Sequence, residues 1–291
     1  MIPASFDYHA PSTIADALAL LDQYGGDAKV LSGGQSLLPM LKIRLAAVGH
    51  LVDIGRIAGL EYVKEEGGFL KIGGATKEVA LERSAIVAAK YPILLDTARV
   101  IADPLVRNRA TVGGNLAHGD PANDHPATML ALDASVVVVG PKGERTIPVS
   151  QFFKGLFTTA LGANEILTEV RIPVPPAKSG GAYVKLERKV GDFATAAAAV
   201  QLTLGAKGEV TKAGIGLTAA GPTPVKATEA EKYLTGKVPD DATVAETARL
   251  AAQAAKPTAD RRGAPDYKRE MARVLTMRAL QTAVRRAGGK A

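Results

Sequence analysis

The chain has 291 residues, of which 47% are hydrophobic and 22% charged, and it carries a formal net charge of +7. This composition excludes a disordered or fibrous chain and predicts a soluble globular protein, with a length typical of two domains. The complete absence of cysteine excludes a disulfide framework, an iron–sulfur cluster, a zinc ribbon and a thiol nucleophile within this chain. Residues 1–7 lack the pattern of a secretory signal, and no stretch has the roughly 18 apolar residues of an integral membrane segment, so we expect a cytoplasmic protein.

The positive charge is concentrated in residues 261–291, which hold nine basic and two acidic residues and so account for the whole net charge. A basic helix can bind nucleic acid or an acidic protein surface. With no tryptophan, 4% aromatic residues and no nucleic-acid motif, we expect no nucleic-acid binding, while docking to a protein remains open. A helix with one buried face and one solvated face is favoured by apolar residues at helical spacing: Met271, Val274, Leu275, Met277 and Leu280.

The first segment, to about residue 56, is predicted to form a small βαβ-like unit. Thr13 and Asp16 are spaced as a capping pair that opens a helix, and Gly25-Gly26 is expected to end it. The expected elements are a strand at 6–9, a helix at 14–24, a strand at 29–31, a short helix at 37–41 and a strand at 50–54.

The remaining chain is predicted to mix strands and helices in two further blocks. Residues 57–176 contain strand patterns at 69–73, 135–139 and 165–172, and helical spacing over 78–91. A linker rich in proline and glycine is expected at 173–181, with a domain boundary between residues 176 and 177. Residues 177–291 contain strand patterns at 182–186, 194–204 and 210–217, followed by helices after Pro224. We therefore expect an α+β protein with a domain at 1–176, divided into subdomains of about 1–56 and 57–176, and a second domain at 177–291.

A glycine loop, Ser32-Gly33-Gly34-Gln35-Ser36, lies between an expected strand and an expected helix. Its backbone N–H groups and serine hydroxyls could surround an anion such as a diphosphate. Taken alone, such a turn is more often purely structural. The Walker pattern is absent and Gly214-Ile215-Gly216 lacks the third glycine of the dinucleotide fingerprint, so an ordinary P-loop or Rossmann site is disfavoured.

A second loop, Thr111-Val112-Gly113-Gly114-Asn115, again offers a hydroxyl, two glycines and an amide. Two such loops on separate subdomains predict that they hold one long dinucleotide between them.

Four side chains that could ligate a metal lie close together, namely His118, Asp120, Asp124 and His125. Pro121 and Pro126 instead predict an irregular, solvated loop without regular ligand spacing, so we expect no metal site. The chain also lacks a Gly-x-Ser-x-Gly nucleophile elbow, which disfavours a hydrolase.

With these loops the chain resembles the FAD-binding medium subunits of molybdenum hydroxylases, and its pattern is similar to that of aerobic carbon monoxide dehydrogenase medium chains. The resemblance spans nearly the whole chain and implies a two-subdomain FAD-binding fold of the vanillyl-alcohol oxidase type (PCMH-like), followed by a C-terminal α+β domain of the CO dehydrogenase flavoprotein type. The matching stretches are residues 2–8, 32–37, 101–104, 111–115, 119–124, 165–167, 171–173, 183–186 and 191–196.

The resemblance also assigns cofactor-binding residues, while no residue of this chain is assigned a catalytic role. Asp124 would bind a ribose hydroxyl, and Lys185, which without the resemblance would be expected on the surface, would lie near the flavin end, where its charge can tune the reduction potential. Ile101 and Leu167 would line apolar parts of the pocket. The diphosphate and adenosine would be held by Ser32, Gly33, Gly34, Gln35, Ser36, Leu37, Thr111, Val112, Gly113, Gly114 and Asn115.

Two positions depart from the pattern of close relatives. Gln35 stands where histidine is frequent, and Phe193 stands beside the flavin where tyrosine is frequent, so a hydrogen bond from that position is lost. Without cysteine, and with glutamine in the loop, the expected FAD is bound non-covalently.

The resemblance further implies a large partner subunit with the molybdenum cofactor and a small partner subunit with two [2Fe–2S] clusters, normally in a dimer of heterotrimers. This chain would take electrons from the clusters and pass them to quinone, oxygen or another acceptor, with peripheral contact to a quinone-linked acceptor as one option. The substrate is selected by the molybdenum subunit and stays open. Two alternatives are a self-sufficient flavin-dependent oxidoreductase of the same fold, for which no persuasive catalytic base is visible, and a basic binding module without enzymatic activity.

Overall fold

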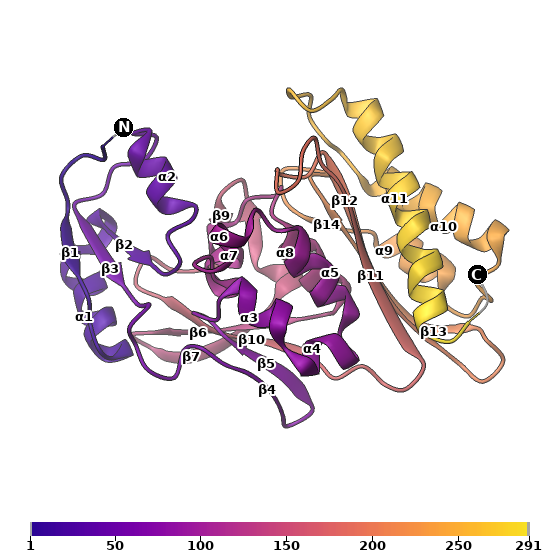
Figure 1. The fold of residues 1–291 in the computed structure, drawn as a ribbon, viewed down its shortest axis with the longest axis horizontal. Coiled ribbons are helices and arrows are strands. Elements are labelled where there is room, and N and C mark those ends of the chain that lie inside the picture. The colour runs from indigo at the N-terminus through magenta and orange to yellow at the C-terminus, as the bar shows by residue number, and fades with distance from the viewer. Residues whose placement is uncertain (1, 290–291) are drawn as a thin grey trace.

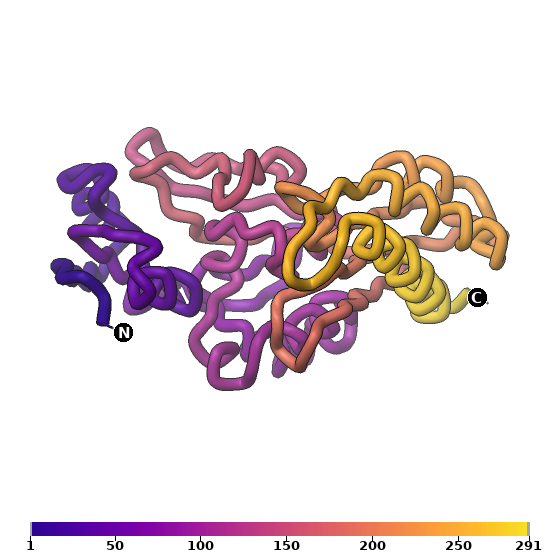
Figure 2. The backbone as a smooth tube through the Cα atoms, turned by 90° about the horizontal axis from the view of Figure 1, so that it is seen from above, coloured from indigo at the N-terminus to yellow at the C-terminus, as the bar shows by residue number. Residues whose placement is uncertain are grey.

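The computed structural model describes residues 2–289 and arranges its main sheets one after another along the long axis of the molecule (Figure 1). Seen from above, the amino-terminal and carboxyl-terminal segments lie at opposite ends (Figure 2). Strands and helices occur in the mixed order expected of an α+β protein, which confirms the predicted fold class. None of the helices within residues 2–289 has the length and apolar character needed to span a membrane.

The amino-terminal unit is a parallel sheet of order β1-β3-β2 with two helices. Thr13 Oγ1 accepts a hydrogen bond from Asp16 N at 3.1 Å, and Gly25 N–H donates to Leu21 O, so the predicted cap and end of the first helix are confirmed. The elements are β1 (Asp7–His9), α1 (Ile14–Tyr24), β2 (Ala28–Leu31), α2 (Leu37–Lys42) and β3 (His50–Asp53).

The middle of the chain forms an antiparallel sheet of order β4-β5-β10-β6-β7, together with six helices and a short hairpin. The single helical pattern expected over 78–91 is two helices, because Ser84 adopts an extended conformation and caps the second helix by accepting from Val87 N. The strands are β4 (Val63–Glu66), β5 (Phe69–Gly73), β6 (Ser135–Gly140), β7 (Gly143–Pro148), β8 (Phe153–Gly155), β9 (Thr158–Thr159) and β10 (Ile166–Pro173). The helices are α3 (Glu78–Arg83), α4 (Ala85–Lys90), α5 (Pro92–Val100), α6 (Pro104–Arg107), α7 (Val112–His118) and α8 (Asp124–Ala131).

The expected solvated loop around Asp124 and His125 was wrong. Both residues lie in the first turn of α8 and are buried. Pro126 is tolerated there because the first N–H groups of a helix have no acceptor within it, so a proline in the first turn costs no hydrogen bond. The proline therefore sits inside a helix rather than marking an irregular loop.

The last part of the chain is an antiparallel sheet of order β11-β12-β13-β14 with three helices. Because β10 ends at Pro173 and β11 already begins at Ser179, the linker is shorter than the expected 173–181. The boundary between residues 176 and 177 lies in this connection and stays a prediction. The elements are β11 (Ser179–Leu186), β12 (Ala196–Leu204), β13 (Val210–Thr218), β14 (Val225–Lys226), α9 (Thr228–Leu234), α10 (Asp241–Ala254) and α11 (Pro265–Arg286).

This sheet is covered on both faces, which explains its small residues. A Cβ at Gly214 or Gly216 would come within 2.0 Å of a backbone oxygen of α8, so only glycine allows β13 to touch that helix. On the opposite face, Ile215 and Leu217 pack in a core shared with α9, α10 and α11. The arrangement brings β11 against α5 of the middle unit, while α8 packs on β12 and β13 (Figure 1).

The basic helix α11 packs through a row of small side chains. Leu275 and Leu280 are buried as expected, whereas Met271, Val274 and Met277 are only partly buried, because alanines rather than these longer side chains meet the sheet. Several of its basic residues pair with acids of this chain, among them Arg269 with Asp266, Arg273 with Glu270 and Arg286 with Asp96.

Candidate functional site

A cleft of about 600 Å³ separates the amino-terminal unit from the middle of the chain. Both glycine loops line it, although some eighty residues separate them in sequence, and Ser32 Oγ lies 2.9 Å from Thr111 Oγ1. The structure therefore brings the two predicted loops together in one cavity. The predicted residues that line it are Ser32, Gly33, Gly34, Gln35, Ser36, Leu37, Thr111, Gly113, Gly114, Asn115 and Leu167.

The first loop connects β2 to α2 and presents free backbone donors. Within the described residues, no protein acceptor faces the backbone N–H groups of residues 33–36. An ideal Cβ at Gly33 would lie 2.3 Å from Arg109 O, so the loop can press against the opposite wall only because glycine stands there. Gln35 Nε2 donates to Gly33 O at 3.2 Å and braces the turn. The loop is suited to bind an anion through consecutive N–H groups.

The second loop contributes in a different way from the first, contrary to the expectation that it repeats the same chemistry. Its four N–H groups from Val112 to Asn115 already donate to Thr76 O, Gly74 O, Thr111 Oγ1 and Thr111 O. Val112 itself is fully buried and does not line the cleft. What the loop offers is side-chain chemistry, because Asn115 Oδ1 is buried and has no hydrogen-bond partner among residues 2–289. An unpaired amide oxygen beside a cleft is suited to a ligand hydroxyl.

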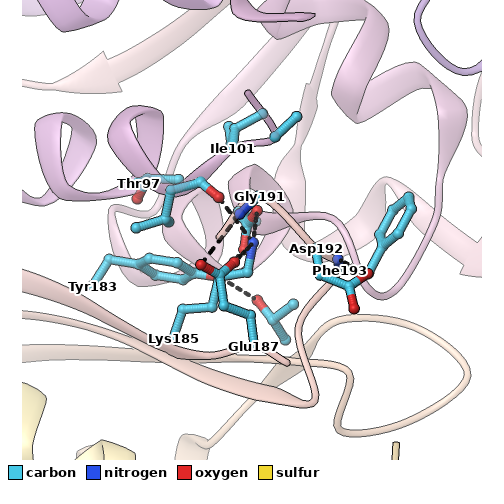
Figure 3. A network of polar contacts seen from close by, with 12 residues as sticks. Thr97, Ile101, Tyr183, Lys185, Glu187, Gly191, Asp192 and Phe193 are labelled. Atoms are coloured by element: carbon cyan, nitrogen blue, oxygen red, sulfur yellow. Dashed lines mark hydrogen bonds and ion pairs between the residues drawn. The ribbon is translucent and has the colours of Figure 1, made fainter. Parts of the chain in front are cut away.

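The four other predicted residues lie outside this cleft. Asp124, at the start of α8, lies with Lys185 and Ile101 where β11 packs against α5, and Figure 3 shows Ile101, Tyr183, Lys185 and Glu187 close together there. The side chain of Lys185 is only 2% exposed, and its Nζ donates to Asp124 Oδ2 and Val100 O, both at 3.0 Å. Phe193 is 49% exposed on the adjoining loop.

Asn123 links the polar cluster around Asp124 to the cleft. Asn123, the neighbour of Asp124 in sequence, donates through Nδ2 to Asn115 O at 2.9 Å. Burial raises the pKa of Asp124, an effect opposed by the Lys185 ammonium and the Tyr183 hydroxyl. Tyr183 Oη donates to Asp124 Oδ1 at 2.6 Å, and burial together with this carboxylate raises the pKa of Tyr183 well above its ordinary value.

Some residues at these two places were not singled out from the sequence. Tyr183 completes the cluster around Asp124, and its only signal is the alternation that places Gly181, Tyr183 and Lys185 on one side of β11. Lys29 and Phe157 also line the cleft, with no local motif to mark them.

The four side chains weighed as a metal site do not converge. His118 lines the cleft, where burial lowers the pKa of its imidazole, whereas Asp124 pairs with Lys185 and His125 pairs with Glu78. Among residues 2–289, no three His, Asp or Glu side chains are grouped to hold a metal ion.

Comparison with known proteins agrees with this geometry. The family model described as the FAD binding domain in molybdopterin dehydrogenase matches residues 4–175, and that of the CO dehydrogenase flavoprotein C-terminal domain matches residues 181–283. A two-subdomain cleft with a glycine loop, followed by this C-terminal sheet, thus defines an FAD-binding flavoprotein fold. The chain belongs to the FAD-binding medium subunits of molybdenum hydroxylases, a family of oxidoreductase subunits of the carbon monoxide dehydrogenase and xanthine dehydrogenase type.

Individual relatives are similar over their full length. The carbon monoxide dehydrogenase medium chain of Afipia carboxidovorans is 47% identical, with 99% of each chain covered. The glyceraldehyde dehydrogenase medium chain of Sulfolobus acidocaldarius is 35% identical, with 97% of this chain and 99% of the relative covered. A solved carbon monoxide dehydrogenase from Hydrogenophaga pseudoflava contains a chain with a TM-score of 0.96 and 47% identity, covering 98% of this chain and 99% of that one.

The residues present fit FAD. The free N–H groups of residues 33–36 match the acceptor oxygens of a diphosphate, and the unpaired Asn115 Oδ1 can accept from a sugar or ribityl hydroxyl. Residues of the amino-terminal unit and of the middle of the chain both line the cleft, as a ligand held between the two requires.

Proposed function

We propose that this chain binds one FAD non-covalently and serves as the electron-transfer subunit of a heterotrimeric molybdenum hydroxylase. The observation that carries the proposal is the row of N–H groups in residues 33–36 that have no acceptor within residues 2–289, on a cleft that Asn115 also lines, in a chain of this family. When bound, FAD supplies a carrier that accepts electrons from [2Fe–2S] clusters of a small partner subunit and delivers them to an external acceptor.

The residues of this chain would divide the work of holding the cofactor. Residues 32–37 bind the diphosphate through N–H groups and hydroxyls, while Thr111 and Asn115 fix the opposite wall. Leu167 provides an apolar surface in the cleft. In the second loop only side chains are assigned to FAD, because the backbone N–H groups of residues 112–115 already donate to other residues of this chain.

The flavin end would lie toward the cluster of Asp124, Lys185 and Ile101, with Phe193 beside it. Because both oxygens of Asp124 accept hydrogen bonds from Tyr183 and Lys185, Asp124 would lie near the flavin with Lys185, in place of the ribose contact that the resemblance implies. The buried Lys185 ammonium keeps a positive charge in a region of low dielectric constant, where it favours added negative charge on a neighbouring group. Phe193 offers an exposed ring face without a hydroxyl, so its contribution is packing.

Partner subunits supply the chemistry that this chain lacks. We propose a large subunit with the molybdenum cofactor and a small subunit with two [2Fe–2S] clusters, in a dimer of heterotrimers. The absence of cysteine supports this division, because iron–sulfur ligands must come from elsewhere. The relatives compared above act on carbon monoxide and glyceraldehyde by name, so similarity in this subunit does not select the substrate. The cytoplasmic location stays a prediction.

The proposal is tested by producing the tagged chain together with the two other subunits of its complex. We expect the three chains to co-purify in equal amounts with one FAD per copy of this chain, and the flavin to bleach when the substrate of the complex is added without oxygen. A tagged chain that binds FAD and is reduced by an organic substrate on its own would instead support the self-sufficient oxidoreductase. A chain that never acquires FAD would overturn both.

A further inference from the structure

The buried Asp124 carboxylate is held by two residues of one strand. Tyr183 Oη donates to Oδ1 at 2.6 Å and Lys185 Nζ donates to Oδ2 at 3.0 Å. Both side chains come from alternate positions of β11 and cross to α8, as Figure 3 shows for Tyr183 and Lys185. Each carboxylate oxygen therefore has its own donor, one charged and one neutral.

The tyrosine hydroxyl is also hydrogen-bonded to a second hydroxyl. Tyr183 Oη lies 3.2 Å from Thr218 Oγ1, at the end of β13, and either atom can donate. If Asp124 is ionised, Tyr183 donates to it. If Asp124 carries a proton, the carboxyl can donate to Tyr183 Oη, which then donates to Thr218 Oγ1. The chain of three groups can thus accommodate both protonation states without moving a heavy atom.

The cluster holds two carboxyl groups and one ammonium group, so a proton on Asp124 would make it electrically neutral. Lys185 is flanked by two acids, because Glu187 Oε2 also lies 3.3 Å from Nζ; this oxygen is buried and accepts no hydrogen bond from the described part of the chain. Burial raises the pKa of Asp124, while Lys185 and Tyr183 act in the opposite direction. The titratable or charged groups facing this site from the surrounding elements are Tyr183, Lys185 and Glu187 from β11, His125 with its partner Glu78 from α8 and α3, and Asp96 from α5.

We propose that Tyr183 is a positioning residue that sets whether Asp124 carries a proton, and thereby how the reduction potential of the bound flavin responds to pH. The inference rests on the proposed function, which puts Asp124 and Lys185 at the flavin end. Added negative charge on a neighbouring group favours the protonated form of Asp124, so proton binding by Asp124 and electron gain are linked. The proton is taken from solvent on reduction and returned on oxidation.

The test compares two tyrosine-to-phenylalanine variants of the flavin-loaded protein. Tyr183→Phe removes the donor to Asp124, and Tyr62→Phe is the matched control, because Tyr62 Oη donates in the same way to Glu169 at 2.5 Å but lies outside the cluster. The midpoint potential of the flavin is measured by reductive titration against reference dyes between pH 5.5 and 9, with thermal melting as a check of the fold.

The wild type should show a bend in the plot of potential against pH, and Asp124→Asn should remove it. Tyr183→Phe should move the bend to higher pH by about one unit, since the lost hydrogen bond favoured the ionised carboxylate. Tyr62→Phe should leave the bend in place. Loss of the bend in Asp124→Asn together with an unmoved bend in Tyr183→Phe would overturn this inference alone. An Asp124→Asn protein that binds FAD with the wild-type potential at every pH would overturn the placement of the cluster at the flavin.

A second measurement needs no variant of Tyr183, in case that protein does not fold. Reduced-minus-oxidised infrared spectra of the wild type should contain a protonated-carboxyl band, absent from Asp124→Asn, accompanied by a shift of a tyrosine C–O band. A carboxyl band without any tyrosine shift would contradict the role of Tyr183.

Discussion

A methyl group added at Gly33 has no room, because the two walls of the FAD cleft touch there. An ideal Cβ would lie 2.3 Å from Arg109 O and 2.8 Å from Ala110 Cα, both backbone atoms that cannot rotate away. Relieving the overlap in Gly33→Ala requires the loop to move off its partner wall, at an overpacking cost of about 1–3 kcal/mol. The same movement stretches the 2.9 Å contact between Ser32 Oγ and Thr111 Oγ1, which is worth about 1 kcal/mol.

Since the free N–H groups belong to this loop, its displacement should also weaken FAD binding. A loss of about 1.4 kcal/mol corresponds to a tenfold higher Kd, so we expect at least about a tenfold weaker complex. The Kd is measured by quenching of flavin fluorescence, and the free energy of unfolding by urea titration. Gly26→Ala is the matched control, because no atom lies within 4 Å of its added Cβ and its backbone conformation suits alanine. If Gly33→Ala bound FAD as tightly as Gly26→Ala, the contact between the two walls would not shape the site.

Three further outcomes are expected. His125 Nε2 lies 2.6 Å from Glu78 Oε2 in a fully buried pair, so His125→Leu should lower the free energy of unfolding in urea by about 3 kcal/mol. The double variant His125→Leu, Glu78→Met should regain part of this loss, and an equal loss in both variants would contradict the reasoning. Ser32→Ala should weaken FAD binding by up to about tenfold and, because it removes the hydrogen bond to Thr111, lower the thermal midpoint of the flavin-free chain by only a few degrees; unchanged FAD binding would contradict this. Removing the flavin should lower the thermal midpoint by about 5 °C, and FAD should restore it better than FMN, which lacks the adenosine half; equal rescue would argue against the diphosphate site.

Much of the fold could be predicted because its signals are local. Thr13 and Asp16 lie within one helical turn, and their cap is readable from spacing alone. Alternation along 69–73 likewise reports which face of a strand is buried, whereas burial along 166–173 does not alternate, because β10 has a register shift between Leu167 and Glu169. The errors came where a distant segment decides the outcome, as at Asp124, which is buried at the start of α8 and accepts a hydrogen bond from Tyr183 of β11.

The sequence could predict which residues line the site, but not which of their hydrogen-bonding groups are free to bind a ligand. Both glycine loops could be recognised from their sequence motifs, and both line one cleft. The sequence could not reveal that the N–H groups after Thr111 are consumed by residues 74–76 and by Thr111 itself, because those hydrogen bonds join separate segments. Nor could it reveal Tyr183, whose importance arises only from its contact with Asp124.

The most direct test of the account is the visible absorption spectrum of the purified full-length chain, with acid release and identification of any flavin and with FAD added back if none is present. We predict a flavin spectrum, quantitative release of FAD by acid and one FAD per chain, with no flavin left attached to the protein. A chain that binds no flavin, either alone or after production with its partner subunits, would contradict the central claim that the cleft between residues 32–37 and 111–115 is an FAD site.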